Sequence, residues 1–109
     1  MSYTIYITAT AERDILRAAD YIEFSLKNPT AAEHLLDVAT EQINSLTNMP
    51  EKFRLADDPV LASWGIHFIM VNNYLAFYTI DVEKQLVIVV RFLYQKSNWN
   101  SILHKRFSL

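Results

Sequence analysis

Residues 86–94 read Leu-Val-Ile-Val-Val-Arg-Phe-Leu-Tyr. Successive side chains of a β-strand point to opposite faces, and here both alternating sets are almost entirely apolar. Such a strand is usually central in its sheet and covered on both sides. The stretch therefore predicts the central strand around which the other elements are arranged. We expect Leu86, Ile88, Val90 and Phe92 on one face, and Val87, Val89 and Leu93 on the other.

Two further runs before this strand predict an antiparallel meander. Residues 66–71 follow Gly65 and are apolar apart from His67, and residues 74–80 form the next run. Asn72-Asn73 separates them, and asparagine tolerates the positive φ of a tight hairpin turn. Residues 81–84 provide the second turn.

Two apolar stripes at helical spacing precede the meander. We expect Thr10 to N-cap the first helix, and Asn28 to N-cap the second with Pro29 at its first position. So short a connection predicts an antiparallel helical hairpin. The first stripe comprises Ala11, Ile15, Ala18, Ala19, Ile22 and Leu26; the second comprises Ala32, Leu35, Leu36, Ala39, Ile43 and Leu46.

The ends of the chain complete the predicted fold. Residues 3–8 alternate apolar and polar side chains, which indicates an N-terminal strand, and Ser97-Asn98 precedes a short helix expected over 99–105. One helical hairpin covers only one face of a sheet, so the other face should be partly exposed or reserved for a partner. We predict one α+β domain over 1–109: an N-terminal strand, an antiparallel helical hairpin, a three-stranded antiparallel meander and a short C-terminal helix.

Composition excludes several classes of function. The single glycine rules out a glycine-rich phosphate loop, and the absence of cysteine rules out disulfides, thiolate zinc sites and a cysteine nucleophile. His34 stands alone on its helix, so no metal site and no cofactor are expected. The longest apolar run, 86–90, is too short to cross a membrane, and no secretion signal is present, so we expect a cytoplasmic protein.

Charge is distributed unevenly along the chain. Residues 1–83 hold all twelve acidic residues and five basic ones, whereas residues 84–109 hold five basic residues and no acid. One interpretation is a site for a polyanion or an acidic partner near the C-terminus. The other is a solvated edge strand and tail that happen to lack carboxylates.

The order of elements and several short motifs resemble the RelE/ParE toxins of bacterial type II toxin–antitoxin pairs. Residues 19–22 end the first helix as Ala-Asp-Tyr-Ile, and Gly65-Ile66-His67 stands where the family usually has Gly-Ile-Arg. Residues 73–78 look like the family's Asn-Tyr-x-x-x-Tyr strand, and Trp99 stands where the ParE-like branch often ends its tail. The resemblance covers about ninety residues. It implies a toxin neutralised by a small antitoxin, with which it can form a hetero-oligomer.

The resemblance implies one of two activities. RelE-like members cut mRNA on the ribosome, which needs groups that deprotonate the 2′-hydroxyl, stabilise the phosphorane and protonate the leaving oxygen. ParE-like members poison DNA gyrase without nuclease chemistry. Matching positions for a nuclease are His67, Arg91, Tyr94 and Lys96, with Lys52 and Arg54 as loop bases and His104 as the nearest terminal proton donor.

We favour gyrase inhibition by binding, without enzymatic activity, because the nuclease set is incomplete. A histidine at position 67 carries little of an arginine's charge at neutral pH. The alternatives are a ribosome-dependent endoribonuclease and a relic that only binds antitoxin. A nuclease needs its groups to converge on one phosphate, whereas a gyrase inhibitor needs its groups exposed. The expected gyrase contacts are Arg91, Lys96, Trp99, Lys105 and Arg106.

Most of these residues also have a structural interpretation. His67 would be a half-buried packing histidine, and Trp99 would cover the open side of the sheet. Arg91 interrupts an apolar strand, where a charge needs a partner such as Asp81 or Asp57. The acids of the first helix, namely Glu12, Asp14 and Asp20, are interpreted as capping and solvent charges.

Large side chains off the core stripe of the first helix suggest an antitoxin surface. Phe24 lies opposite the stripe, while Leu16 and Tyr21 flank it. Such side chains leave apolar surface for a partner. By the resemblance, that partner is an extended tail that wraps the hairpin.

Overall fold

The computed structural model describes residues 2–107, and the side chains of residues 2–105. Its helices and strands follow the order predicted from the sequence, with one additional short helix before the meander. They are β1 (Thr4–Ile7), α1 (Ala9–Asp20), the π-helix η1 (Tyr21–Ser25), α2 (Pro29–Asn44), the 3₁₀ turns η2 (Ser45–Thr47) and η3 (Pro50–Lys52), α3 (Pro59–Ser63), β2 (His67–Val71), β3 (Tyr74–Asp81), β4 (Leu86–Tyr94) and α4 (Trp99–Phe107).

The strands form one four-stranded sheet in the order β1-β4-β3-β2. β4 lies between β1, to which it is parallel, and β3, to which it is antiparallel. The prediction that residues 86–94 form an inner strand is therefore confirmed. Asn72 has a φ of 54° in the β2–β3 turn, as the asparagine pair predicted.

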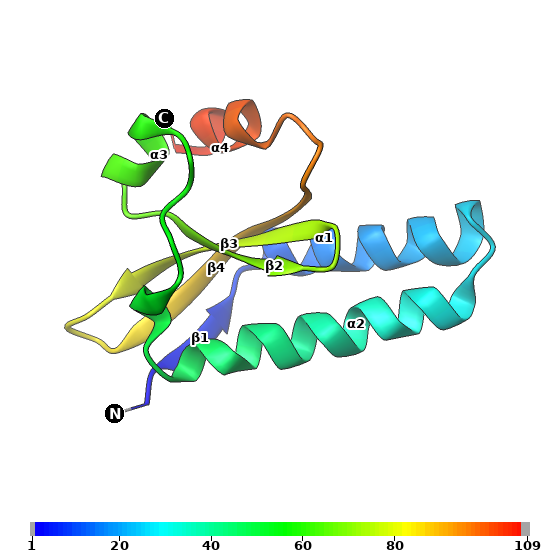
Figure 1. Ribbon diagram of the computed structural model, residues 1–109, viewed down its shortest axis with the longest axis horizontal. Coiled ribbons are helices and arrows are strands. Elements are labelled where there is room, and N and C mark those ends of the chain that lie inside the picture. Colours follow the sequence, from blue (N-terminus) through cyan, green and yellow to red (C-terminus); the bar gives the residue numbers. More distant parts are fainter. Residues whose placement is uncertain (1, 108–109) are drawn as a thin grey trace.

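Helices cover both faces of the sheet. The α1–α2 hairpin packs on one face, where its stripe residues meet Val87, Val89 and Tyr78. On the other face α3 and α4 contribute Leu61 and Leu103 to a second core (Figure 1). α3 and α4 cover only part of this second face, and Met70 of β2 is 51% exposed on it, so the expectation of a partly exposed face is confirmed outside the covered area.

A β-bulge changes which side chains of β4 share a face. The register shifts between Phe77 and Tyr78, so Val90 has no direct partner on β3. A bulge inserts one extra residue and so reverses the alternation beyond it. Phe92 consequently packs in the core between the sheet and the α1–α2 hairpin, and Leu93 packs against the second core. Strict alternation predicted each of them on the opposite face.

Side-chain caps fix the helix starts. Asn28 caps α2 by accepting the amide of Ala31, as predicted. Thr8, and not Thr10, caps α1: its Oγ1 accepts the amide of Ala11. The prediction of Thr10 was two residues late because β1 passes directly into α1.

The first helix changes to a π-helix at Tyr21, and none of the five η1 residues is buried. The amide of Leu26 donates to the carbonyl of Tyr21, five residues back. Leu26, predicted as a member of the buried stripe, is consequently 56% exposed. The outer part of the hairpin extends past the ends of the strands (Figure 1).

The α+β fold predicted from the sequence is confirmed. Within the part of the chain that the structure describes, no helix is both long enough and apolar enough to span a bilayer.

Candidate functional site

Arg91 is held by Asp14. Its Nε donates to Asp14 Oδ2 at 2.7 Å and its Nη2 donates to Oδ1 at 3.1 Å. The backbone amide of Phe92 donates to the same carboxylate at 3.0 Å. β1 pairs with β4 only as far as Val89. The carboxylate therefore occupies the edge of β4 at the point where its parallel strand has ended.

This arrangement corrects two predictions. The partner of Arg91 is neither Asp81 nor Asp57, and Asp14 is a buried charge, not a solvent charge. Asp81 instead accepts the amide of Lys84 in the β3–β4 turn. The helical periodicity of α1 indicated that Asp14 is buried, because it lies three residues after Ala11 and four before Ala18, on the buried side of the helix.

The His67 ring is held by contacts with Phe53 and Tyr78. Its Nδ1–H donates to the carbonyl of Phe53 at 2.8 Å, and its ring stacks on Tyr78 with centroids 5.3 Å apart. A carbonyl oxygen only accepts, so Nδ1 carries the proton. The Tyr78 hydroxyl donates to the Pro50 carbonyl at 2.6 Å, and burial raises the pKa of Tyr78 above its usual range.

The structure does not bring the four nuclease candidates together. His67 pairs with Tyr78 in the middle of β3, and Tyr94 pairs with Tyr74 at its start. Four residues of strand separate these positions by roughly 13 Å. Of the remaining two candidates, Arg91 is engaged by Asp14, and Lys96 lies exposed in the turn after β4.

The loop bases also have contacts within the chain. The Lys52 ammonium lies 5.2 Å from the centre of the Phe53 ring, and the Arg54 guanidinium lies 5.5 Å from that of Phe68. Both geometries are those of cation–π pairs at a surface.

The C-terminal candidates are partly exposed and partly packed. Lys96 and Lys105 are exposed, whereas the Trp99 ring packs on Phe77 with centroids 5.3 Å apart. Trp99 thus covers the second core, as its structural interpretation predicted. Arg106 is in α4, but its side chain lies outside the described residues.

His104 links α4 to the segment before α3. Its Nε2 lies 3.0 Å from Asp58 Oδ2, and Asp58 Oδ1 accepts the amides of Val60 and Leu61 at the start of α3. The amide of Leu61 is the largest cause that lowers the pKa of Asp58, and His104 adds to it. Among residues 2–105, no three histidines or acids are close enough to hold a metal ion.

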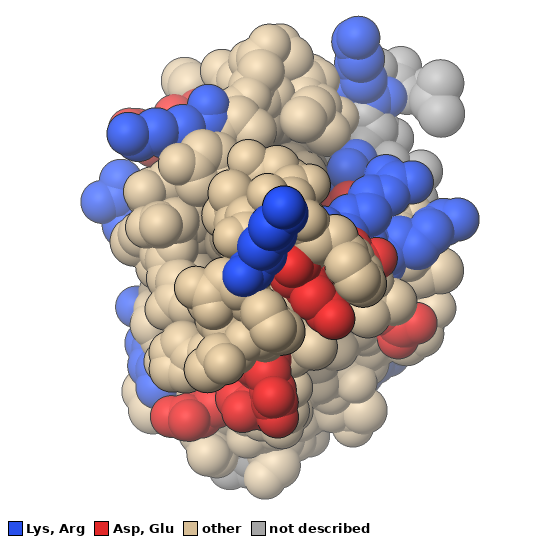
Figure 2. All heavy atoms as spheres, turned by 90° about the vertical axis from the view of Figure 1, so that its right-hand side faces the viewer, with Lys and Arg blue, Asp and Glu red and all other residues tan. Residues whose placement is uncertain are grey.

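The predicted antitoxin residues are exposed on the hairpin. Leu16, Tyr21 and Phe24 all have more than half of their surface accessible, and Phe24 is 68% exposed. Figure 2 views the molecule toward the tip of the hairpin. A basic side chain stands at the centre of this view with acidic side chains beside and below it, and further basic side chains lie toward both sides (Figure 2).

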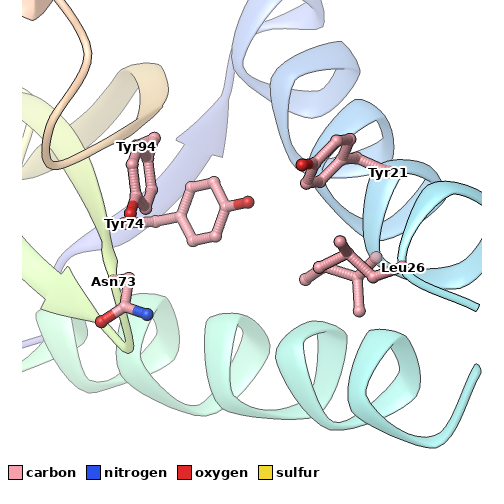
Figure 3. Close-up of a pocket in the computed structure, with 6 residues that line it drawn as sticks. Tyr21, Leu26, Asn73, Tyr74 and Tyr94 are labelled. Carbon is pink, nitrogen blue, oxygen red and sulfur yellow. The ribbon is translucent and has the colours of Figure 1, made fainter. Parts of the chain in front are cut away.

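A pocket of about 520 Å³ lies between the hairpin and the ends of β3 and β4. Figure 3 shows the Tyr74 side chain projecting across it toward Tyr21, with Tyr94 beside Tyr74 and Leu26 on the far wall. Burial, with Tyr94 and Tyr21 nearby, raises the pKa of Tyr74. Sequence reasoning identified Tyr21 and Tyr94 for other roles but missed the pocket, because nothing in the local sequence signals η1. The lining consists of Tyr21, Ile22, Leu26, Asn73, Tyr74 and Tyr94.

Comparison with known proteins gives one family and two similar folds. A family model described as the ParE toxin of the type II toxin–antitoxin system parDE matches residues 5–99. No curated protein matches the sequence.

Two solved structures share the fold at low identity. One is a chain from the chromosomal ParDE TA system of P. aeruginosa, with a TM-score of 0.70 and 15% identity, covering 85% of this chain and 96% of that one. The other is a chain from the toxin–antitoxin complex RelBE2 of Mycobacterium tuberculosis, with a TM-score of 0.58 and 20% identity, covering 86% and 99%.

Proposed function

The chain belongs to the ParE toxin family of type II toxin–antitoxin systems, and on that premise we propose that it inhibits DNA gyrase by binding and is held inactive by a cognate antitoxin. We favour gyrase binding over mRNA cleavage because the candidate nuclease residues lie apart in the structure. The positions at which His67 and Tyr94 pair with β3 lie four residues apart along that strand, and Asp14 neutralises Arg91.

A ribonuclease would need these groups around one phosphate. Proton transfer requires an acid or base within about 3 Å of the atom that it serves, directly or through one water. Groups roughly 13 Å apart along a strand cannot both reach the same scissile bond. A protein that acts by binding requires only that its contacts be accessible, which Lys96 and Lys105 are.

The proposed gyrase surface is the C-terminal segment from Lys96 through α4. Two exposed lysines supply the charge: Lys96 lies in the turn before α4, and Lys105 lies on α4, whose Trp99 packs on the sheet. Arg91 contributes by fixing the end of β4 and not by direct contact, because its charge is already paired. Arg106 is included as a further cation of the same helix.

The antitoxin partner is supported by the two similar structures, which come from a ParDE system and a RelBE2 toxin–antitoxin complex. We assign Leu16, Tyr21 and Phe24 to its binding because they are large, apolar and exposed on one hairpin. Such a surface on a single domain marks an interaction site.

The test mixes the purified protein with DNA gyrase, ATP and supercoiled plasmid, and resolves the DNA on a gel after protease treatment. We expect linear plasmid DNA, which carries linked protein until the protease removes it. Unchanged gyrase activity at a large excess of the protein would contradict the proposal. Translating ribosomes tested in parallel separate the remaining alternatives: mRNA cleavage would indicate a ribonuclease, and no effect in either assay would indicate a relic that only binds antitoxin.

A further inference from the structure

The pocket between the hairpin and the sheet, here called the tyrosine pocket, is built from two separate parts of the fold. Tyr21, Ile22 and Leu26 come from the end of the first helix, and Asn73, Tyr74 and Tyr94 come from the far ends of β3 and β4. The Tyr74 ring is fixed between Phe92, on which it stacks at 5.1 Å, and Tyr94, whose ring lies edge-on at 5.6 Å. The sheet wall of the pocket is therefore preorganised.

The hairpin wall has an unusual backbone. A π-helix is rare, appears mostly as a single turn, and is frequent at functional sites. Here it spans Tyr21–Ser25, none of whose residues is fully buried, and of these only Ile22 packs against the core. By adding residues to the turn it changes the direction of the side chains that follow. Leu26 lines the pocket in consequence, instead of continuing the buried stripe.

The chemistry of the lining restricts the occupant. The lining holds no lysine, arginine, histidine or acid: it consists of three tyrosines, one asparagine and two aliphatic side chains. A nucleic acid would require cations for its phosphates, and the lining supplies none. Rings and aliphatic groups bury apolar surface, while phenol and amide groups can bond the peptide groups beside it. The pocket thus fits an apolar side chain of a peptide segment.

We propose that the tyrosine pocket receives a bulky aliphatic or aromatic side chain of the antitoxin, whose segment bridges the hairpin tip and the ends of β3 and β4. The inference rests on the proposed antitoxin partner. It adds a second antitoxin contact beside the exposed hairpin residues Leu16, Tyr21 and Phe24. Tyr21 also lines the pocket, so the two contacts are continuous. A segment so placed contacts both the hairpin wall and the sheet wall of the pocket (Figure 3).

The test measures affinity for the full-length antitoxin of the same module by calorimetry. Leu26→Glu places a charge on the hairpin wall, and Asn73→Trp fills the pocket from the sheet wall without adding charge. Both positions are exposed, so the fold should tolerate them. Val60→Glu is the matched control, because Val60 is an exposed apolar residue on α3, outside the lining.

We expect each pocket variant to weaken binding at least tenfold and the control to change it less than twofold. Leu26→Glu should also inhibit gyrase as the wild type does, yet escape neutralisation by the antitoxin. Wild-type affinity in both pocket variants would overturn the pocket while leaving the antitoxin partner intact. No binding to the unmodified chain would overturn both. A wild-type dimer that Leu26→Glu dissociates in sedimentation would assign the pocket to a second copy and also overturn the inference.

Discussion

Asp14 and Arg91 lie 77 residues apart in the chain and form an ion pair with two contacts, at 2.7 and 3.1 Å. The same carboxylate accepts the amide of Phe92, so one side chain of α1 both neutralises Arg91 and completes the edge of β4. Unpaired edge amides invite pairing with other chains, and this contact removes one of them. The helical hairpin is thereby fixed to the sheet beyond the end of β1.

Removing one partner of this pair should destabilise the fold strongly. Asp14→Ala leaves the Arg91 charge buried without a partner, and we expect a loss of about 3–5 kcal/mol in the free energy of unfolding. The double variant Asp14→Leu/Arg91→Leu should lose much less than the sum of the single changes, because no charge is then left unpaired. Urea denaturation of Asp14→Ala, of the single variants Asp14→Leu and Arg91→Leu, and of the double variant measures both quantities. Additive losses would contradict the coupling inferred from the geometry.

The start of α1 provides a second stability test. Thr8 accepts the amide of Ala11, and its hydroxyl donates to the carbonyl of Val89 at 3.0 Å, so it joins α1 to β4. Thr8→Ala should cost about 1–2 kcal/mol, at the upper end for an N-cap. Thr10→Ala is the control, since Thr10 lies within the helix and alanine has the higher helix propensity. An equal loss in both variants would contradict the assignment of the cap.

The main elements could be predicted because their signals are local. The two apolar faces of residues 86–94 identified the inner strand, and Asn28-Pro29 identified the start of α2. A local signal for α3 was also present, with Asp58 as N-cap before Pro59, but the sequence interpretation placed no helix between the hairpin and the meander. Pattern and capping chemistry thus account for most of the architecture.

The candidate site was harder to predict because its determinants are not local. The sequence showed that Arg91 needs an acid, but the choice of Asp14 depends on how α1 crosses β4. The tyrosine pocket depends on η1, for which the sequence offers no pattern, and on a turn some fifty residues later. The bulge at Val90 likewise reverses the faces of Phe92 and Leu93 without any glycine to mark it.

Tyr78 should make the stability of the fold depend on alkaline pH. Burial raises its pKa above the usual 10, so the folded chain holds a proton that the unfolded chain releases. Folding stability should therefore be independent of this group below pH 10 and fall as the pH rises above 10. Tyr78→Phe should remove this part of the decline. At neutral pH it should cost about 1–3 kcal/mol, because the Pro50 carbonyl loses its donor.

Urea midpoints of the wild type and Tyr78→Phe at pH 8 and pH 11 check this prediction. Other tyrosines and the lysines titrate in both proteins, so the difference between the two declines isolates Tyr78. Parallel declines would show that its phenol ionises equally in the folded and unfolded chains.

Phe24 tests the exposed face of the hairpin. Phe24→Arg should leave the thermal midpoint nearly unchanged, because Phe24 makes little contact with the core, and should weaken antitoxin binding by about tenfold or more, or 1.4 kcal/mol. Val82→Arg is the matched control: Val82 is 69% exposed and lies in the β3–β4 turn. Calorimetric titration measures both. Equal affinities for the two variants would remove Phe24 from the interface.

Lys96 and Lys105 test the proposed gyrase surface. Reversing both charges should weaken gyrase inhibition by about tenfold or more, because an exposed basic surface attracts and orients an oppositely charged partner. The fold and the affinity for antitoxin should be retained, since neither lysine lines the tyrosine pocket or belongs to the hairpin set.

The control for this double variant is Lys27→Glu/Lys84→Glu. It changes the net charge of the chain by the same amount but at the hairpin tip and the β3–β4 turn. Inhibition that depends on the location of the charge should survive in the control and fail in Lys96→Glu/Lys105→Glu, as the yield of linear plasmid measures. If both variants lost inhibition equally, only the overall charge would matter, and the C-terminal segment would not be the gyrase surface.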